Sequence, residues 1–150
     1  MSQIHVIKQE ALGCGIACLV SVLRDSNPTI DHRQICCGVL KDVLHCGGPL
    51  EGAFLPHLLA GFVLSLGIAN HFVTGQGRQF IEDSVPFVHD ACVILYQSGG
   101  HFLRLAGASQ SGFAAMCPSR AAIVPIDWSH ADEYFVYRCL RTGSFQALPI

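Results

Sequence analysis

The chain has 150 residues, enough for one domain with a hydrophobic core of its own. Apolar residues make up 51% and charged residues 13%, a composition that excludes an intrinsically disordered chain. The net charge of −2, with the nine Lys and Arg residues scattered, argues against a nucleic-acid-binding protein.

The apolar run Ile16–Leu23 predicts the first helix, which is apolar nearly all round and is therefore expected at the centre of a domain. Polar residues and Pro28 end it. Cys14, between two glycines, lies at its expected N-terminus. Unpaired backbone N–H groups and the helix dipole favour a thiolate there, so we expect a lowered pKa and a nucleophilic sulfur. The alternative is a buried structural cysteine.

Two more helices are expected in the first half of the chain. One spans Asp31–Leu44 and ends before a glycine–proline segment, and the other spans about Glu51–Leu66. The most apolar window, Ala53–Ala69, contains Pro56 and is shorter than the roughly 20 residues that a membrane helix needs. We therefore expect a core helix there and no membrane span.

From Ile68 onward the sequence predicts only strands, separated by Gly, Pro and Ser. The expected strands are Ile68–Val73, Ala91–Tyr96, His101–Ala106, Phe113–Met116, Ala121–Ile126 and Glu133–Leu140. The Gly-Gly pair in segment 97–100 predicts a hairpin. Helices followed by such strands predict a single α+β domain over residues 1–150, a two-layer domain with N-terminal helices packed on a C-terminal antiparallel sheet.

One of the eight histidines, His101, begins an apolar strand directly after a glycine turn. Leu103 and Leu105 share its face of the expected strand, so His101 lies at the rim of a buried face. An imidazole is the group that usually holds and activates a thiolate. A polar residue at a hairpin end is the alternative, but together with Cys14 the catalytic interpretation is favoured.

Eight cysteines raise the question of disulfides and metal sites. No basic segment followed by an apolar one is visible at the N-terminus, so reduced thiols and a cytoplasmic location are expected. There is no Cys-x-x-Cys motif, and His32 with Cys36 is only a pair, so we expect no metal site and no cofactor. The low content of charge indicates an apolar patch that a protein partner or a substrate covers.

The segment 9–19, with its Cys14-Gly-x-Ala pattern, and the strand opening Gly-His101-Phe resemble the C39 peptidases of the papain-like group. The best-known members process bacteriocins by removing a leader peptide after a double glycine. Segments 5–7 and 132–136 are also similar to guanylyl-cyclase-domain-containing proteins of the C39-like group. The resemblance implies a papain-like (C39-like) fold, in which a helix that carries the nucleophile faces a sheet that supplies the base.

The resemblance also implies roles for three residues. Cys14 would be the nucleophile that forms an acyl-enzyme, and His101 would be the general base. Gln9 and the Cys14 backbone N–H would stabilise the oxyanion. The substrate would be a peptide or a protein. The Gln-to-Cys spacing is one residue shorter than in the family.

The third member of the site is open. The family has Asp-Pro downstream of the histidine strand, where this chain has Cys117 followed by proline. Either Cys117 fills the position that orients the imidazole, or Ser119 or Asp127 does so, or the chain works as a Cys–His dyad.

Three functions follow from these residues. The first is a C39-like cysteine peptidase or hydrolase that cleaves a peptide or amide bond through Cys14 and His101. The second is a papain-like acyltransferase, a transglutaminase-type modifier or a delivered toxin domain. The third is a catalytically impaired pseudo-peptidase that binds a peptide, an interpretation that Cys117 favours because a thiol is a weak hydrogen-bond partner for an imidazole.

Overall fold

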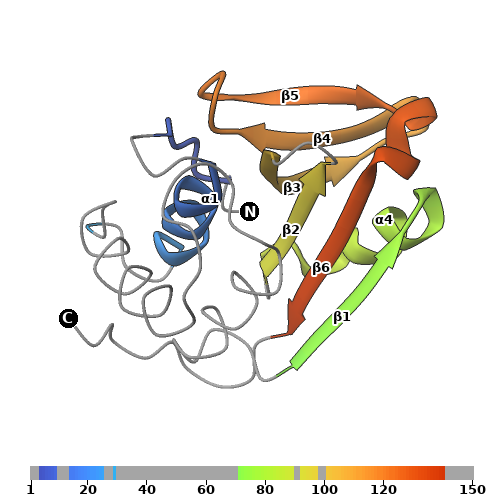
Figure 1. Cartoon of the computed structure of the whole chain (residues 1–150), viewed down its shortest axis with the longest axis horizontal. Coiled ribbons are helices and arrows are strands. Elements are labelled where there is room, and N and C mark those ends of the chain that lie inside the picture. Colours follow the sequence, from blue (N-terminus) through green and yellow to red (C-terminus); the bar gives the residue numbers. More distant parts are fainter. Residues whose placement is uncertain are drawn as a thin grey trace, which may run out of the picture.

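The computed structural model of the chain describes residues 4–9, 14–25, 29, 71–89, 92–97 and 101–140 (Figure 1). The helices expected over 31–44 and 51–66 lie outside these residues. The described part consists of an N-terminal helix, a six-stranded antiparallel sheet from residues 71–140, and short helical segments between the strands.

Helix α1 spans Cys14–Leu23, so the first predicted helix is confirmed, and it begins at Cys14 itself. Its residues Ala17 and Val20 are fully buried, as an all-round apolar sequence predicts. Ser21 is also fully buried, and its Oγ donates to the backbone carbonyl of His5 at 2.6 Å. The helix is thereby covered on one side by the preceding segment of chain, which meets the hydrogen-bonding need of its polar side chain.

The sheet contains β1 (His71–Gln76), β2 (Cys92–Gln97), β3 (His101–Ala108), β4 (Gly112–Cys117), β5 (Ala122–Asp127) and β6 (Tyr134–Leu140). The strand order is β1-β6-β2-β3-β4-β5, and all neighbours are antiparallel. The last five expected strands agree with these bounds to within one or two residues. The pairing of Gln97 with His101 confirms the predicted hairpin between β2 and β3.

A helix that was not expected follows β1. Helix α4 spans Arg78–Ser84 and continues as the 3-10 turn η1 (Val85–Phe87), so the expectation of strands only is wrong here. Gly77, with a φ of 93°, turns the chain into the helix. Arg78 and Glu82 form an ion pair of 3.0 Å one turn apart. With less than two turns, α4 is too short to show a helical period in the sequence.

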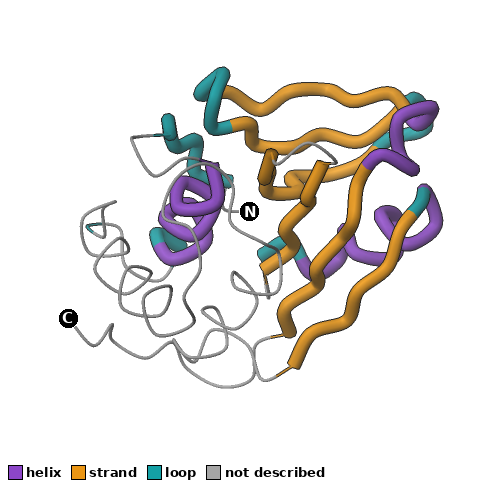
Figure 2. The backbone as a smooth tube through the Cα atoms, in the orientation of Figure 1, coloured by secondary structure: helices purple, strands orange, loops and turns teal. Residues whose placement is uncertain are grey.

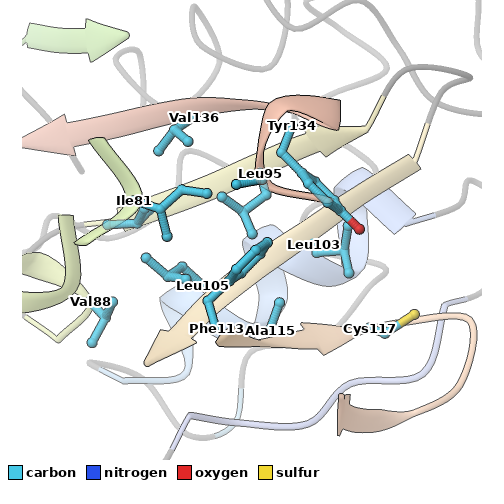
Figure 3. Close-up of a cluster of buried hydrophobic side chains, with 12 residues drawn as sticks. Ile81, Val88, Leu95, Leu103, Leu105, Phe113, Ala115, Cys117, Tyr134 and Val136 are labelled. Carbon is cyan, nitrogen blue, oxygen red and sulfur yellow. The ribbon is translucent and has the colours of Figure 1, made fainter. Parts of the chain in front are cut away.

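The side chains on the two faces of strand β3 pack in different surroundings. Leu103 and Leu105 face a core cluster that also receives Ile81 from α4 (Figure 3). The other members of this cluster are Val88, Val93, Leu95, Phe113, Ala115, Cys117, Tyr134, Val136 and, from the 3-10 segment η2 (Trp128–Glu133), Ala131. Arg104 alternates with these leucines and donates to Ser21 of α1. The packing of an N-terminal helix on the sheet is confirmed for α1, and α4 covers the opposite face (Figure 2).

Candidate active site

Three residues singled out from the sequence lie at the ends of elements that meet. Cys14 is the first residue of α1, His101 is the first of β3, and Cys117 is the last of β4. Antiparallel pairing through Arg104 and Met116 brings the end of β4 to the beginning of β3, and α1 packs on β3. Two thiols and an imidazole from distant parts of the chain therefore gather at one corner of the fold.

The Cys14 thiol contacts the backbone of β3. The Phe102 N–H donates to Cys14 Sγ at 3.1 Å, and Cys14 is only 5% exposed. Burial raises the pKa of this thiol above its ordinary value of 9.0, while the backbone N–H groups of Phe102, Cys14 and Gly15 lower it by less. The lowered pKa expected from a helix N-terminus is therefore wrong, because desolvation of the thiolate outweighs the backbone donors.

The imidazole of His101 contacts the second thiol. Its Nε2 lies 3.4 Å from Cys117 Sγ. The residue is half-buried, and burial lowers the pKa of the imidazole below its ordinary value of 6.5. A neutral ring that carries its proton on Nε2 has the lone pair on Nδ1 available to accept a proton. A partner on Nε2 can fix that tautomer, as the third member of a catalytic triad does.

The geometry separates the three candidates for this third position. Cys117, 5% exposed, contacts the ring of His101 directly. Ser119 lies one contact further out, with its Oγ 3.2 Å from Cys117 Sγ. Asp127 is exposed at the opposite end of the β4–β5 ladder, in register with Gly112. An orienting role for Asp127 is therefore excluded by its position.

Gln9 is attached to the same corner through its backbone. Its N–H donates to the carbonyl of Pro118 at 3.0 Å, and the residue is half-buried. This bond places the segment Ile4–Gln9 beside the turn that follows β4, next to Cys117. The oxyanion role of the Gln9 amide stays a prediction.

Two contributors to this corner were missed in the sequence. Phe102 acts through its backbone N–H, which no pattern of side chains reveals. Arg104 is fully buried between β3 and α1. A signal for it was present, because a charged residue inside the apolar strand Phe-Leu-Arg-Leu must be paired if it is buried.

Other features of the described residues lie away from this corner. Within this part of the chain, no three His, Cys, Asp or Glu side chains are grouped to hold a metal ion, and no helix has the length and apolar content to cross a membrane. A surface groove of about 540 Å³ lies over β3, β4 and β5, with Ala106, Phe113 and Pro125 in its walls. Neither Cys14 nor His101 lines it, so the groove is separate from the thiol–imidazole corner.

The fold is similar to that of known peptidase domains. No protein-family model and no curated protein matches the sequence. The peptidase domain of Streptococcus ComA, a bifunctional ABC transporter involved in a quorum-sensing pathway, matches with a TM-score of 0.65 at 9% identity, over 93% of this chain and 100% of that one. A double-glycine-motif protease from an AMS/PCAT transporter, in complex with the leader peptide, matches with a TM-score of 0.53 at 17% identity, over 89% of each chain. The chain therefore shares the fold of these two peptidase domains.

Proposed function

We propose that this chain is a cysteine peptidase-like hydrolase that cleaves a peptide or amide bond through an acyl-enzyme on Cys14, with His101 as general base. One observation carries the proposal: consecutive residues of β3 contact the two thiols. The His101 ring lies 3.4 Å from Cys117, and the Phe102 N–H donates to Cys14 at 3.1 Å. The candidate base is therefore a residue of β3, and the candidate nucleophile contacts the next residue of the same strand. The C39-like fold supports the same chemistry.

Acylation starts from a neutral pair. The Sγ–H proton of Cys14 passes to His101 Nδ1 as the sulfur attacks the carbonyl carbon of the substrate and forms the C–S bond. The imidazolium then protonates the leaving amine as the C–N bond breaks. Burial supports this order of events, since it raises the pKa of Cys14 and lowers that of His101, and so opposes a resting thiolate–imidazolium pair.

The negative charge that develops on the carbonyl oxygen needs donors. The Cys14 backbone N–H at the start of α1 is one, and we assign the second to the Gln9 side-chain amide. The bond from the Gln9 N–H to Pro118 supports this assignment because it holds the residue at the same corner. Water, activated by His101, then attacks the thioester and releases the acid product, which restores the thiol.

Cys117 takes the third position in this proposal. Its sulfur accepts from His101 Nε2–H, and the thiol in turn is within hydrogen-bond reach of Ser119 Oγ at 3.2 Å. A relay of neutral groups fixes the ring tautomer but holds the imidazolium less strongly than a carboxylate does. The chain is therefore a working dyad with a weak orienting thiol.

The test is hydrolysis of a peptide that contains a Gly-Gly motif, and mass spectrometry identifies the products. One protease with a similar fold is a double-glycine-motif protease solved in complex with the leader peptide, and that substrate class is the one we propose to try first. We expect Cys14→Ala to abolish cleavage and His101→Ala to lower kcat by a factor of about 10²–10⁴.

Matched controls exist on the same elements. Cys18→Ala removes a second buried thiol of α1, and His130→Ala removes an exposed imidazole that pairs with Glu133. Both variants are expected to keep the wild-type rate. Unchanged cleavage by Cys14→Ala would overturn the proposed nucleophile.

A second function, a peptide-binding pseudo-peptidase, is favoured by two observations. The raised thiol pKa and the thiol on His101 Nε2 both lower the reactivity of the pair. Titration of the Gly-Gly peptide, followed by calorimetry, separates the two functions. Binding with no turnover by the wild-type protein, and with equal affinity for Cys14→Ala, is the result that supports the second.

Four finer expectations stay predictions. They are transfer of the acyl group to an acceptor other than water, as in an acyltransferase, transglutaminase-type modifier or delivered toxin domain; the likeness to guanylyl-cyclase-domain-containing proteins; a cytoplasmic location; and a protein partner over an apolar patch.

A further inference from the structure

A buried arginine joins the strand that carries His101 to the helix that carries Cys14. Arg104 is fully buried, three residues after His101 in β3. Its Nη1 donates to Ser21 Oγ at 3.0 Å, and its Nη2 donates to Asp25 Oδ2 at 2.6 Å. Nη2 also donates to the carbonyl of Val88 at 3.1 Å. The guanidinium thus holds the last part of α1 and the turn after it.

The same group of residues holds a third segment. Ser21 Oγ donates to the carbonyl of His5 at 2.6 Å, and His5 Nε2 lies 3.5 Å from Asp25 Oδ1. We call His5, Ser21, Asp25 and Arg104 the anchor cluster. The segment that begins beside His5 ends at Gln9, which bonds to Pro118. The anchor cluster therefore contacts all three segments that bear the candidate nucleophile, base and oxyanion donor.

Hydrogen bonds near each end of α1 join the helix to β3. The first is the bond from the Phe102 N–H to Cys14 Sγ at the start of the helix. The second is the bond from Arg104 to Ser21, seven residues later, about 10 Å along the helix axis. Bonds near both ends of the helix constrain its angle on the strand as well as its position, in addition to the apolar packing of α1 on β3.

The energetics of the Arg104–Asp25 ion pair favour a role in geometry over a role in stability. Desolvation makes a buried ion pair no better for stability than apolar side chains of the same volume. The rest of the helix surface is apolar, and apolar packing is not directional. A planar guanidinium with several directed bonds supplies the orientation that such packing lacks.

We infer that Arg104 is a positioning residue, which holds Cys14 against the Phe102 N–H of the strand that carries His101. The inference rests on the proposed function for its catalytic meaning. The experiment measures the reactivity of the Cys14 thiol and needs no substrate. The inference and the proposed function can therefore fail separately.

The experiment measures the rate of Cys14 alkylation by iodoacetamide against pH in Arg104→Met. Trypsin releases residues 9–24 as one peptide that contains Cys14 and Cys18, and fragment ions distinguish the two thiols. We expect the midpoint for Cys14 to rise by about one pH unit, because the thiolate loses its alignment with the Phe102 donor. Cys18, fully buried in the same helix, is expected to stay protected and reports any general opening of α1.

Arg138→Met is the matched control. Arg138 lies on β6, donates to Ser84 of α4 and stacks on Phe80 and Phe87, so it joins the sheet to the opposite helix. Its removal is expected to leave the Cys14 midpoint unchanged at a comparable loss of melting temperature. An equal shift in Arg138→Met, or no shift in Arg104→Met, would overturn the positioning role.

Arg104→Lys keeps the inference testable if the methionine variant does not fold. Lysine retains the cation for Asp25 but cannot bond to Ser21, Asp25 and Val88 with one planar fork. We expect a smaller upward shift of the Cys14 midpoint than in Arg104→Met, together with a lower kcat at nearly unchanged KM where wild type cleaves peptide. A wild-type midpoint in folded Arg104→Lys contradicts the inference.

Discussion

The Nε2 nitrogen of His101 lies 3.4 Å from the sulfur of Cys117, the residue that ends the neighbouring strand β4. A triad would have a carboxylate in this place, to fix the ring and to stabilise its protonated form. The thiol keeps the geometry and supplies little charge. Much of the behaviour that we predict for the site follows from this exchange of groups.

A carboxylate at position 117 is predicted to increase the peptidase activity. In Cys117→Asp a charged acceptor replaces a weak neutral one, and the difference of about 1 kcal/mol corresponds to a rise of about fivefold in kcat/KM. The measurement is steady-state cleavage of the Gly-Gly peptide. Cys117→Ala, with no partner for Nε2, is expected to be slower than wild type. A rate for Cys117→Ala equal to wild type means that the thiol orients nothing.

The pH profile of kcat/KM for peptide cleavage is predicted to be broad. Burial lowers the pKa of His101, so the neutral base persists below pH 6.5, and burial raises the pKa of Cys14, so the protonated thiol persists above pH 9.0. The value of kcat/KM should therefore be flat between these limits, with the acid limb below 6.5 and the alkaline limb above 9.0. Alkylation of Cys14 that is already maximal at pH 6.5 would show a resting ion pair instead.

Gln9→Ala is predicted to reduce kcat with little change in KM. An oxyanion donor acts on charge that develops in the transition state, and removal of one such donor costs a factor of about 10²–10³. Gln76→Ala is the control, because Gln76 donates to the carbonyl of Asp132 away from the site. A wild-type kcat in Gln9→Ala would leave the Cys14 backbone N–H as the donor and remove Gln9 from the proposal.

Phe113→Ala is predicted to destabilise the fold by about 3–5 kcal/mol, because it leaves a cavity in the core. The ring is 2% exposed and lies edge-on to Tyr134 with a centroid separation of 5.6 Å. Urea denaturation measures the loss of unfolding free energy. Phe135→Ala is the comparison: that ring is 47% exposed, and its removal is expected to cost less than about 0.5 kcal/mol.

The sequence predicted the elements whose signals are local. The apolar run after Cys14 predicted α1, and apolar segments punctuated by glycine, proline and serine predicted β2 to β6 and the hairpin at 97–100, whereas the first expected strand overlaps β1 only over residues 71–73. It also singled out Cys14 and His101 of the candidate site, because a cysteine at a helix start and a histidine at a strand start are each recognisable from the residues next to them. Helix α4 was missed, since seven residues are too few to show a period.

The tertiary structure decided what those residues do to one another. Whether a thiol is acidic depends on how deeply it is buried, and burial reversed the pKa shift that the helix terminus alone predicts for Cys14. Which group faces His101 depends on strand register, which chose Cys117 over Asp127. The contact of α1 with β3 includes a bond from the buried Arg104 to Ser21, which lies 83 residues away in the sequence. Desolvation, register and buried pairing arise from contacts between distant segments, so local sequence cannot set them.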